Sequence, residues 1–175
     1  MRKIIFLDVD GVLNNENWIK ETKTDLIPEK IELLKEIVEK TGAKIVLSSS
    51  WRVMKTRLPL DVGNPMLEYL EKELKKYGLT IYDKTPVIGY NRPKEIRAWL
   101  DNQQDKDVRF ASLDDDFQKH KYDEVGIGDC LVRTSFYEKD GGLRQEHVEK
   151  AVEILNREDW NVICKSRQKN GEAWI

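Results

Sequence analysis

The sequence contains little cysteine, little histidine and no long apolar run. Cys130 and Cys164 lack the spacing of a redox pair or zinc site, and two cysteines in 175 residues do not indicate a disulfide framework. His120 and His147 likewise lack metal-ligand spacing to each other. No apolar stretch is long enough to span a bilayer, and the one after Met1 is too short for the core of a signal peptide. We therefore expect a reduced cytoplasmic protein without a membrane partner.

The chain also lacks a strong excess of either charge. It has 30 lysines and arginines against 32 aspartates and glutamates, a net charge of −2, and a pI near 5.8. This balance argues against nucleic-acid binding through bulk positive charge, although local basic patches are compatible with it. The length is that of one domain. We expect that domain over residues 1–158, followed by an extension over 159–175 in which Asn170-Gly171 indicates a β-hairpin turn.

Short apolar runs alternate with amphipathic helical patterns along the chain. This alternation is typical of an α/β fold with a doubly wound, Rossmann-like and mostly parallel sheet. The expected helices cover residues 28–40, 65–77, 93–103 and 145–156, and the expected strands cover 4–9, 45–47, 79–82, 108–113 and part of 125–134.

The most informative segment is Ile4–Val12, an apolar strand that ends in two carboxylates, Asp8 and Asp10, followed by Gly11. Open α/β sheets bind ligands at the carboxyl ends of their strands. The two carboxylates can share an orientation if the chain bends after Val9, and glycine supplies the freedom for that bend. Such a pair attracts a hard divalent cation, most simply Mg²⁺. A plain Asp-Gly turn is the simpler alternative.

Three further predicted element ends carry polar residues. The strand Val108–Leu113 runs into Asp114–Asp116, the strand at 45–47 ends in Ser48–Arg52, and Lys94 opens a helical pattern. Considered singly, each is better explained as a loop, a helix cap or a solvated side chain.

In this order the motifs resemble the four-motif signature of the haloacid dehalogenase (HAD) superfamily over nearly the whole chain: DxDGV, an apolar run ending in serine, lysine at a helix start, and an apolar run ending in DD. The segments IVLSSSWR, RPKEIRAWL and FASLDDDF are most similar to small HAD domains related to polynucleotide 3′-phosphatases of nucleic-acid repair. The resemblance implies a HAD-like fold and a phosphatase. The intervals 13–27 and 52–93 leave no room for the large cap domain of many HAD enzymes, and an uncapped site favours a large substrate.

Within that resemblance, Asp8 is the expected nucleophile, which attacks phosphorus to form an aspartyl-phosphate. Mg²⁺ held by Asp8, the Asp10 carbonyl and either Asp114 or Asp115 would offset the negative charge of the substrate. Asp10 would protonate the leaving alcohol and then accept a proton from water. An aspartate at this position points to a phosphatase or phosphotransferase, because dehalogenases and ion-pumping ATPases of the family have other residues there.

Four residues are expected to contact the substrate phosphate. Lys94 would supply a second cation, and Ser48 would donate a hydroxyl hydrogen bond, with Ser49 as the alternative if the register differs by one. Arg52 could reach a phosphate through its planar guanidinium, with a surface salt bridge as an equal alternative. We expect Trp51 to pack rather than to stack on a base, although single-strand binders use tryptophan in that way.

Three functions are compatible with these residues. The first is a Mg²⁺-dependent phosphomonoesterase that acts on an RNA or DNA end, most sharply as a 3′-phosphatase. The second is the same chemistry on a small nucleotide or sugar phosphate, with a neighbouring subunit closing the site. The third is a HAD-like binding module without catalysis, which the complete set of motif residues disfavours.

Overall fold

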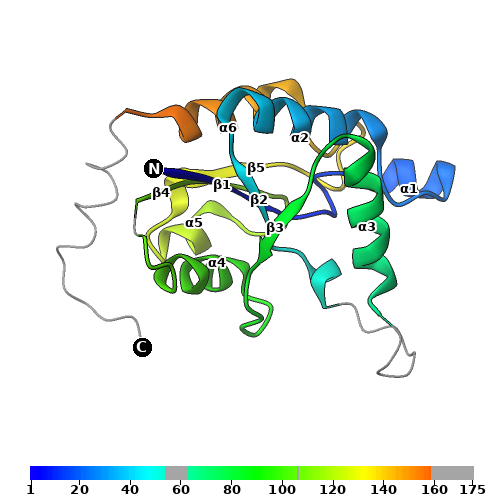
Figure 1. Ribbon diagram of the computed structural model, residues 1–175. Helices are drawn as coiled ribbons and strands as arrows, with labels where there is room; N and C mark the ends of the chain where they lie inside the picture. The colour runs from blue at the N-terminus through cyan, green and yellow to red at the C-terminus, as the bar shows by residue number, and fades with distance from the viewer. Residues whose placement is uncertain (54–62, 106, 159–175) are drawn as a thin grey trace.

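The computed structural model describes residues 1–53, 63–105 and 107–158, and its elements follow one another as Figure 1 shows. In chain order they are β1 (Arg2–Leu7), α1 (Glu16–Thr22), α2 (Pro28–Thr41), β2 (Lys44–Leu47), η1 (Ser50–Arg52), α3 (Pro65–Lys76), β3 (Ile81–Lys84), α4 (Arg92–Asp101), β4 (Val108–Asp114), α5 (Lys119–Asp123), η2 (Gly128–Cys130), β5 (Leu131–Arg133) and α6 (Gln145–Asn156).

The strands form one sheet in the order β3-β2-β1-β4-β5, and every neighbouring pair is parallel. Helices cover both faces: α2 and α6 lie on one, and α4 and α5 on the other (Figure 1). The predicted doubly wound α/β fold is therefore confirmed. Because β1 is the central strand, the residues that follow it lie between the ends of β2 and β4.

The packing of Phe6 on β1 fixes which side chains share a face. Its ring meets Trp99 of α4 edge to face with centroids 5.3 Å apart, and Phe110 of β4 at 5.6 Å. Alternate residues of a strand share a face, so Asp8 projects from the α4 face with Phe6, and Asp114 projects with Phe110. The polar strand ends thus converge beside the start of α4.

The predicted helices form close to their expected bounds, because their sequences contain start and stop signals. Helix α2 begins at Pro28 and ends before Gly42, which has a left-handed φ of 68° and donates its N–H to the Val38 carbonyl. Strand β3 begins two residues later than expected, because the N–H of Leu79 donates to the carbonyl of Leu74 and so still belongs to the end of α3.

Helices α1 and α5 lie in segments that gave no helical signal. Helix α1 buries none of its residues, so apolar periodicity could not reveal it, and α5 is only five residues long. Within the described ranges, the interval between β1 and α2 contains no inserted domain larger than α1. The hairpin predicted at 159–175 lies outside the described residues. None of the described helices has the length and apolar character needed to cross a membrane.

Candidate active site

Three carboxylates meet at the carboxyl ends of β1 and β4. Asp8, Asp114 and Asp115 each present an oxygen within 4.8 Å of the others. Asp8 and Asp114 are buried, and Asp115 is partly buried. The N–H of Asp8 donates to the carbonyl of Leu113 over 3.0 Å, so hydrogen bonding between the two strands continues into the site. The structure therefore brings together three of the four predicted metal ligands.

Asp115 reaches this cluster by passing close to Gly11. The glycine has a φ of +69°, and a Cβ there would lie 2.1 Å from the Cγ of Asp115. The hydroxyl of Thr134 donates to the Gly11 carbonyl over 2.6 Å, which ties this turn to the end of β5. Burial, followed by the charges of Asp114 and Asp116, raises the pKa of Asp115 to about 6. A bound cation would favour the charged form of this carboxylate.

Asp114 is held by Tyr122 of α5. The tyrosine hydroxyl donates to Oδ2 of Asp114 over 2.6 Å and lies 2.9 Å from the hydroxyl of Ser112. Burial raises the pKa of Tyr122 well above its usual range, so its hydroxyl stays a donor. The other oxygen of Asp114 accepts the N–H of Asp116 over 2.9 Å. No sequence pattern marked Tyr122, because it lies in a helix of one turn.

Arg92, at the start of α4, supplies the positive charge of the site. Its guanidinium forms an ion pair with Asp8 and lies 3.3 Å from Oδ1 of Asp114. Its Nε is buried and has no hydrogen-bond partner among the described residues. The structure does not bring the predicted Lys94 to these carboxylates. Lys94 is exposed, and because it lies two positions after Arg92 on the helix, its side chain points about 200° around the helix axis from that of Arg92.

Asp10 is not a member of the carboxylate cluster. One oxygen accepts the indole N–H of Trp51 over 2.9 Å, and the other accepts the side-chain amide of Asn14 over 2.9 Å. The amide oxygen of Asn14 accepts the N–H of Gly11 in turn. This arrangement leaves the Asp10 carboxylate out of the cluster, so its main-chain carbonyl is the only group it could offer to a metal there. Trp51 is 2% exposed, which confirms that it packs and excludes base stacking.

The structure has the geometry that the four motifs predict. Acidic residues lie at the ends of β1 and β4, a serine lies at the end of β2, and a cation lies at the start of α4. A model for the HAD domain in Swiss Army Knife RNA repair proteins matches residues 4–148. The chain belongs to this family. The predicted HAD resemblance and its relation to nucleic-acid repair proteins are thus confirmed. No curated protein sequence matches the chain significantly.

The acidic cluster of this HAD domain fits a hard divalent cation. Asp8, Asp114 and Asp115 offer only oxygen ligands, which Mg²⁺ prefers over sulfur or imidazole nitrogen. The guanidinium of Arg92 is the only cation within ion-pair distance of Asp8 or Asp114 in the described chain. Burial and the charges of Asp114 and Asp116 raise the pKa of Asp115 although Arg92 acts in the opposite direction.

The two candidate serines of the HAD domain have different surroundings. Ser48 is fully buried and accepts a hydrogen bond from the hydroxyl of Thr85 over 3.2 Å. Val46 pairs with Phe6 in the sheet, so Ser48 shares the face of Asp8. Ser49 instead caps η1, where its hydroxyl accepts the N–H of Trp51. The geometry therefore favours Ser48 over Ser49 for contact with a phosphate.

Arg52 is not available for a substrate. It forms a buried ion pair with Glu95 of α4 over 2.6 Å, and the two side chains are 4% and 2% exposed. It also donates to the carbonyls of Thr85 and Pro86. The second carboxylate oxygen of Glu95 accepts the N–H of Ile88. The structure thus does not place Arg52 for the predicted phosphate contact, because its guanidinium joins η1 and α4 to the loop after β3.

Proposed function

We propose that this HAD domain is a Mg²⁺-dependent phosphomonoesterase that works through an aspartyl-phosphate on Asp8. The observation that carries this proposal is the buried cluster of Asp8, Asp114 and Asp115 with Arg92 against the nucleophile. When bound by the three carboxylates, the cation would act as a Lewis acid on the phosphoryl group and offset its charge. The family match supports the reaction class.

The residues around Asp8 have distinct roles in this scheme. A carboxylate oxygen of Asp8 attacks phosphorus as the bond from phosphorus to the alcohol oxygen breaks. Asp10, oriented by Trp51 and Asn14, gives the leaving oxygen a proton, and later takes one from the water that hydrolyses the acyl phosphate. Arg92 donates to the phosphoryl oxygens, and a substrate oxygen would satisfy its unpartnered Nε. Ser48 would support the same group through its hydroxyl.

A polynucleotide end is the substrate that the surroundings favour. Tyr90 is 69% exposed and lies two residues before Arg92, in a turn closed by the N–H of Asn91 and the carbonyl of Ile88. Its φ of 56° is unfavourable for tyrosine, so the turn holds a strained residue next to the site. An exposed ring there could stack on a base beside the terminal phosphate, which is the role that Trp51 cannot fill. We propose 3′-phosphate removal as the reaction.

The decisive experiment is phosphate release from 3′-phosphorylated and 5′-phosphorylated oligonucleotides, nucleoside 3′-monophosphates and sugar phosphates. We expect kcat/KM to be about tenfold or more higher for the 3′-phosphorylated oligonucleotide than for the mononucleotide, since a stacked base contributes about 1–3 kcal/mol. Tyr90→Ala should remove this advantage. Tyr82 is 47% exposed on β3 and packs under the ammonium of Lys44, so Tyr82→Ala is a matched control that should keep the advantage.

A higher efficiency with a sugar phosphate or nucleotide would replace the polynucleotide reading with the small-ester alternative. Asp8→Asn separates catalysis from binding, because an amide cannot act as the nucleophile. It should abolish phosphate release without unfolding the protein, and rapid quenching of the unsubstituted protein with ³²P-labelled substrate should trap label on Asp8. Absence of turnover with every ester in the presence of Mg²⁺ would favour the non-catalytic binding module.

A further inference from the structure

A basic pocket of about 460 Å³ lies at the β5 edge of the sheet, away from the carboxylate cluster. Four of its lining residues are cations from three different elements, and one is acidic: Lys119 of α5, Arg133 of β5, Lys150 of α6, Arg157 just after α6, and Asp129 of η2. In a chain whose net charge is −2, this is a local concentration of positive charge.

The sheet register connects the basic pocket with the active site. Arg133 is paired with Asp114 in the parallel register of β5 and β4, so the two side chains project from the same face. Neighbouring strands lie about 4.8 Å apart, so the route from Asp8 on β1 across β4 to Arg133 is about 10 Å. Lys119 follows the acidic loop that contains Asp115. The pocket therefore begins within reach of the nucleotides that would follow a terminal phosphate held at Asp8.

Two of the four cations have no counter-ion among the described residues. Lys119 forms an ion pair with Asp123 at 2.7 Å and lies 3.5 Å from Asp129. Arg133 and Lys150 are both exposed, and no carboxylate of the described residues lies within ion-pair distance of either. Cations that are held near one another without partners repel, and an anionic ligand would relieve this repulsion.

We propose that the basic pocket binds the phosphodiester backbone of a single-stranded polynucleotide whose terminal phosphate lies at Asp8. This inference rests on the proposed function and deepens it. Arg133 contacts the phosphate nearest to the active site, and Lys150 contacts the next. The backbone reaches the β5 edge at Arg133, which lies at the carboxyl end of β5 level with Asp114, and it follows that edge because no strand of the described residues pairs there. An acidic protein would also complement the positive charge of the pocket, but it would not account for the short route from the pocket to the proposed phosphatase site.

The test is binding of a short single-stranded RNA that ends in a 3′-hydroxyl, which resembles the product and cannot be hydrolysed. Fluorescence anisotropy of the labelled RNA gives Kd at several salt concentrations. The double variant Arg133→Glu/Lys150→Glu should weaken binding by about tenfold or more at low salt. The neutral variant Arg133→Gln/Lys150→Gln should reduce the slope of log K against log salt by about 1.4, since each phosphate contact to a single strand contributes about 0.7.

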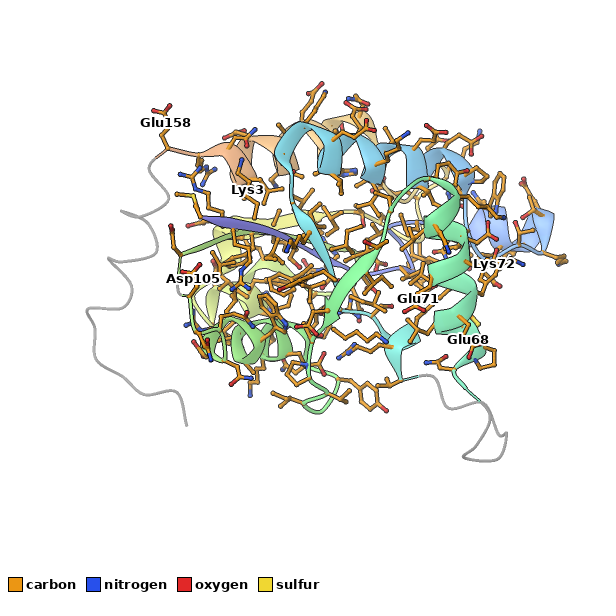
Figure 2. The ribbon with its side chains drawn as sticks, in the orientation of Figure 1. Lys3, Glu68, Glu71, Lys72, Asp105 and Glu158 are labelled. Atoms are coloured by element: carbon orange, nitrogen blue, oxygen red, sulfur yellow. The ribbon has the colours of Figure 1, made fainter. Side chains whose placement is uncertain are left out.

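A matched control changes the same charge on another surface. Lys72 and Lys75 are exposed on α3, and Figure 2 shows Lys72 at the opposite side of the molecule from Glu158, the residue after Arg157. Lys72→Glu/Lys75→Glu should leave RNA binding within about twofold of the original value. An equal loss of affinity in this control would show a bulk charge effect and overturn the assignment of the pocket.

Two other results would also overturn the inference. One is unchanged RNA affinity in Arg133→Glu/Lys150→Glu, and the other is binding of poly-glutamate as tightly as RNA, which would indicate an acidic protein partner. Turnover of p-nitrophenyl phosphate, which is too small to reach the pocket, reports the proposed function separately and should persist in all three double variants. Loss of pocket-dependent RNA binding with turnover intact refutes only the pocket. Absence of turnover with pocket-dependent binding intact refutes only the phosphatase.

Discussion

The indole N–H of Trp51 donates to the carboxylate of Asp10 over 2.9 Å, although the two residues lie 41 positions apart. This bond orients the proposed acid and base, and Trp51 itself is buried. Trp51→Phe keeps most of the packing and removes only the donor. We expect kcat to fall by about tenfold or more with little change in KM, because general acid-base catalysis contributes about 10²–10⁴ to a rate.

Trp99 provides the matched control for this prediction. It is also buried, and its indole N–H donates to Asp83 over 2.7 Å, away from the carboxylate cluster. Trp99→Phe should therefore lower stability about as much as Trp51→Phe while leaving kcat unchanged. Equal losses of kcat in the two variants would show that Trp51 acts only through general packing.

The structure and the sequence indicate different cations for the site: the structure indicates Arg92, and the sequence indicated Lys94. Because Arg92, unlike Lys94, forms an ion pair with Asp8, Arg92→Ala should lower kcat/KM by about 10²-fold or more, the usual loss when a donor to a developing negative charge is removed. Lys94→Ala should change it by no more than about twofold. Steady-state kinetics with an aryl phosphate measures both variants, and a larger loss in Lys94→Ala would restore the sequence-based assignment.

The fold could be predicted from the sequence because apolar spacing reports burial directly. The buried residues Ile31, Leu34 and Ile37 recur at helical spacing in α2, and Ile45–Leu47 is a short buried run in β2. The convergence of Asp8 with Asp114 followed from parallel strands, whose carboxyl ends lie at one edge of the sheet. These predictions needed only local pattern and one rule of topology.

The remaining parts of the site depend on contacts between distant residues. The choice between Arg92 and Lys94 is a choice of helix rotation, and the packing of α4 on the sheet sets that rotation. The side chain of Arg52 could not be placed, because its partner Glu95 lies 43 positions away and no pattern links the two. The bond from Tyr122 to Asp114 spans only eight positions, but it could not be predicted because Tyr122 lies in a helix too short to give a sequence pattern.

Because Arg52 forms an ion pair with Glu95, we expect substitution of Arg52 to lower the stability of the protein and not its affinity for substrate. Both side chains are buried, so Arg52→Met leaves an uncompensated carboxylate in the interior. We expect the free energy of unfolding in urea to fall by about 3–5 kcal/mol. The exposed pair of Arg97 and Asp101 on α4 is the matched control, and Arg97→Met should cost no more than about 1 kcal/mol.

A second substitution tests the cause of that loss. Adding Glu95→Gln removes the buried charge, so the double variant should be more stable than Arg52→Met alone. A double variant that is less stable than either single variant would show that packing of the Arg52 side chain, and not the uncompensated charge, dominates.

Gly11 links the backbone of the first motif with Asp115, which we propose as a metal ligand. A Cβ at this position would lie 2.1 Å from the Cγ of Asp115, so Gly11→Ala must displace that carboxylate from the cluster. We expect the affinity for Mg²⁺ or Mn²⁺, measured by calorimetric titration, to fall by about tenfold or more.

Gly42→Ala separates this clash from backbone strain: Gly42 has nearly the same φ, +68°, but no atom within 4 Å of its Cβ position. Both variants should lose about 1–2 kcal/mol of stability from the left-handed conformation, and only Gly11→Ala should lose metal affinity. Equal metal affinity in the two variants would mean that Asp115 is not a ligand and that Asp8 and Asp114 hold the cation without it.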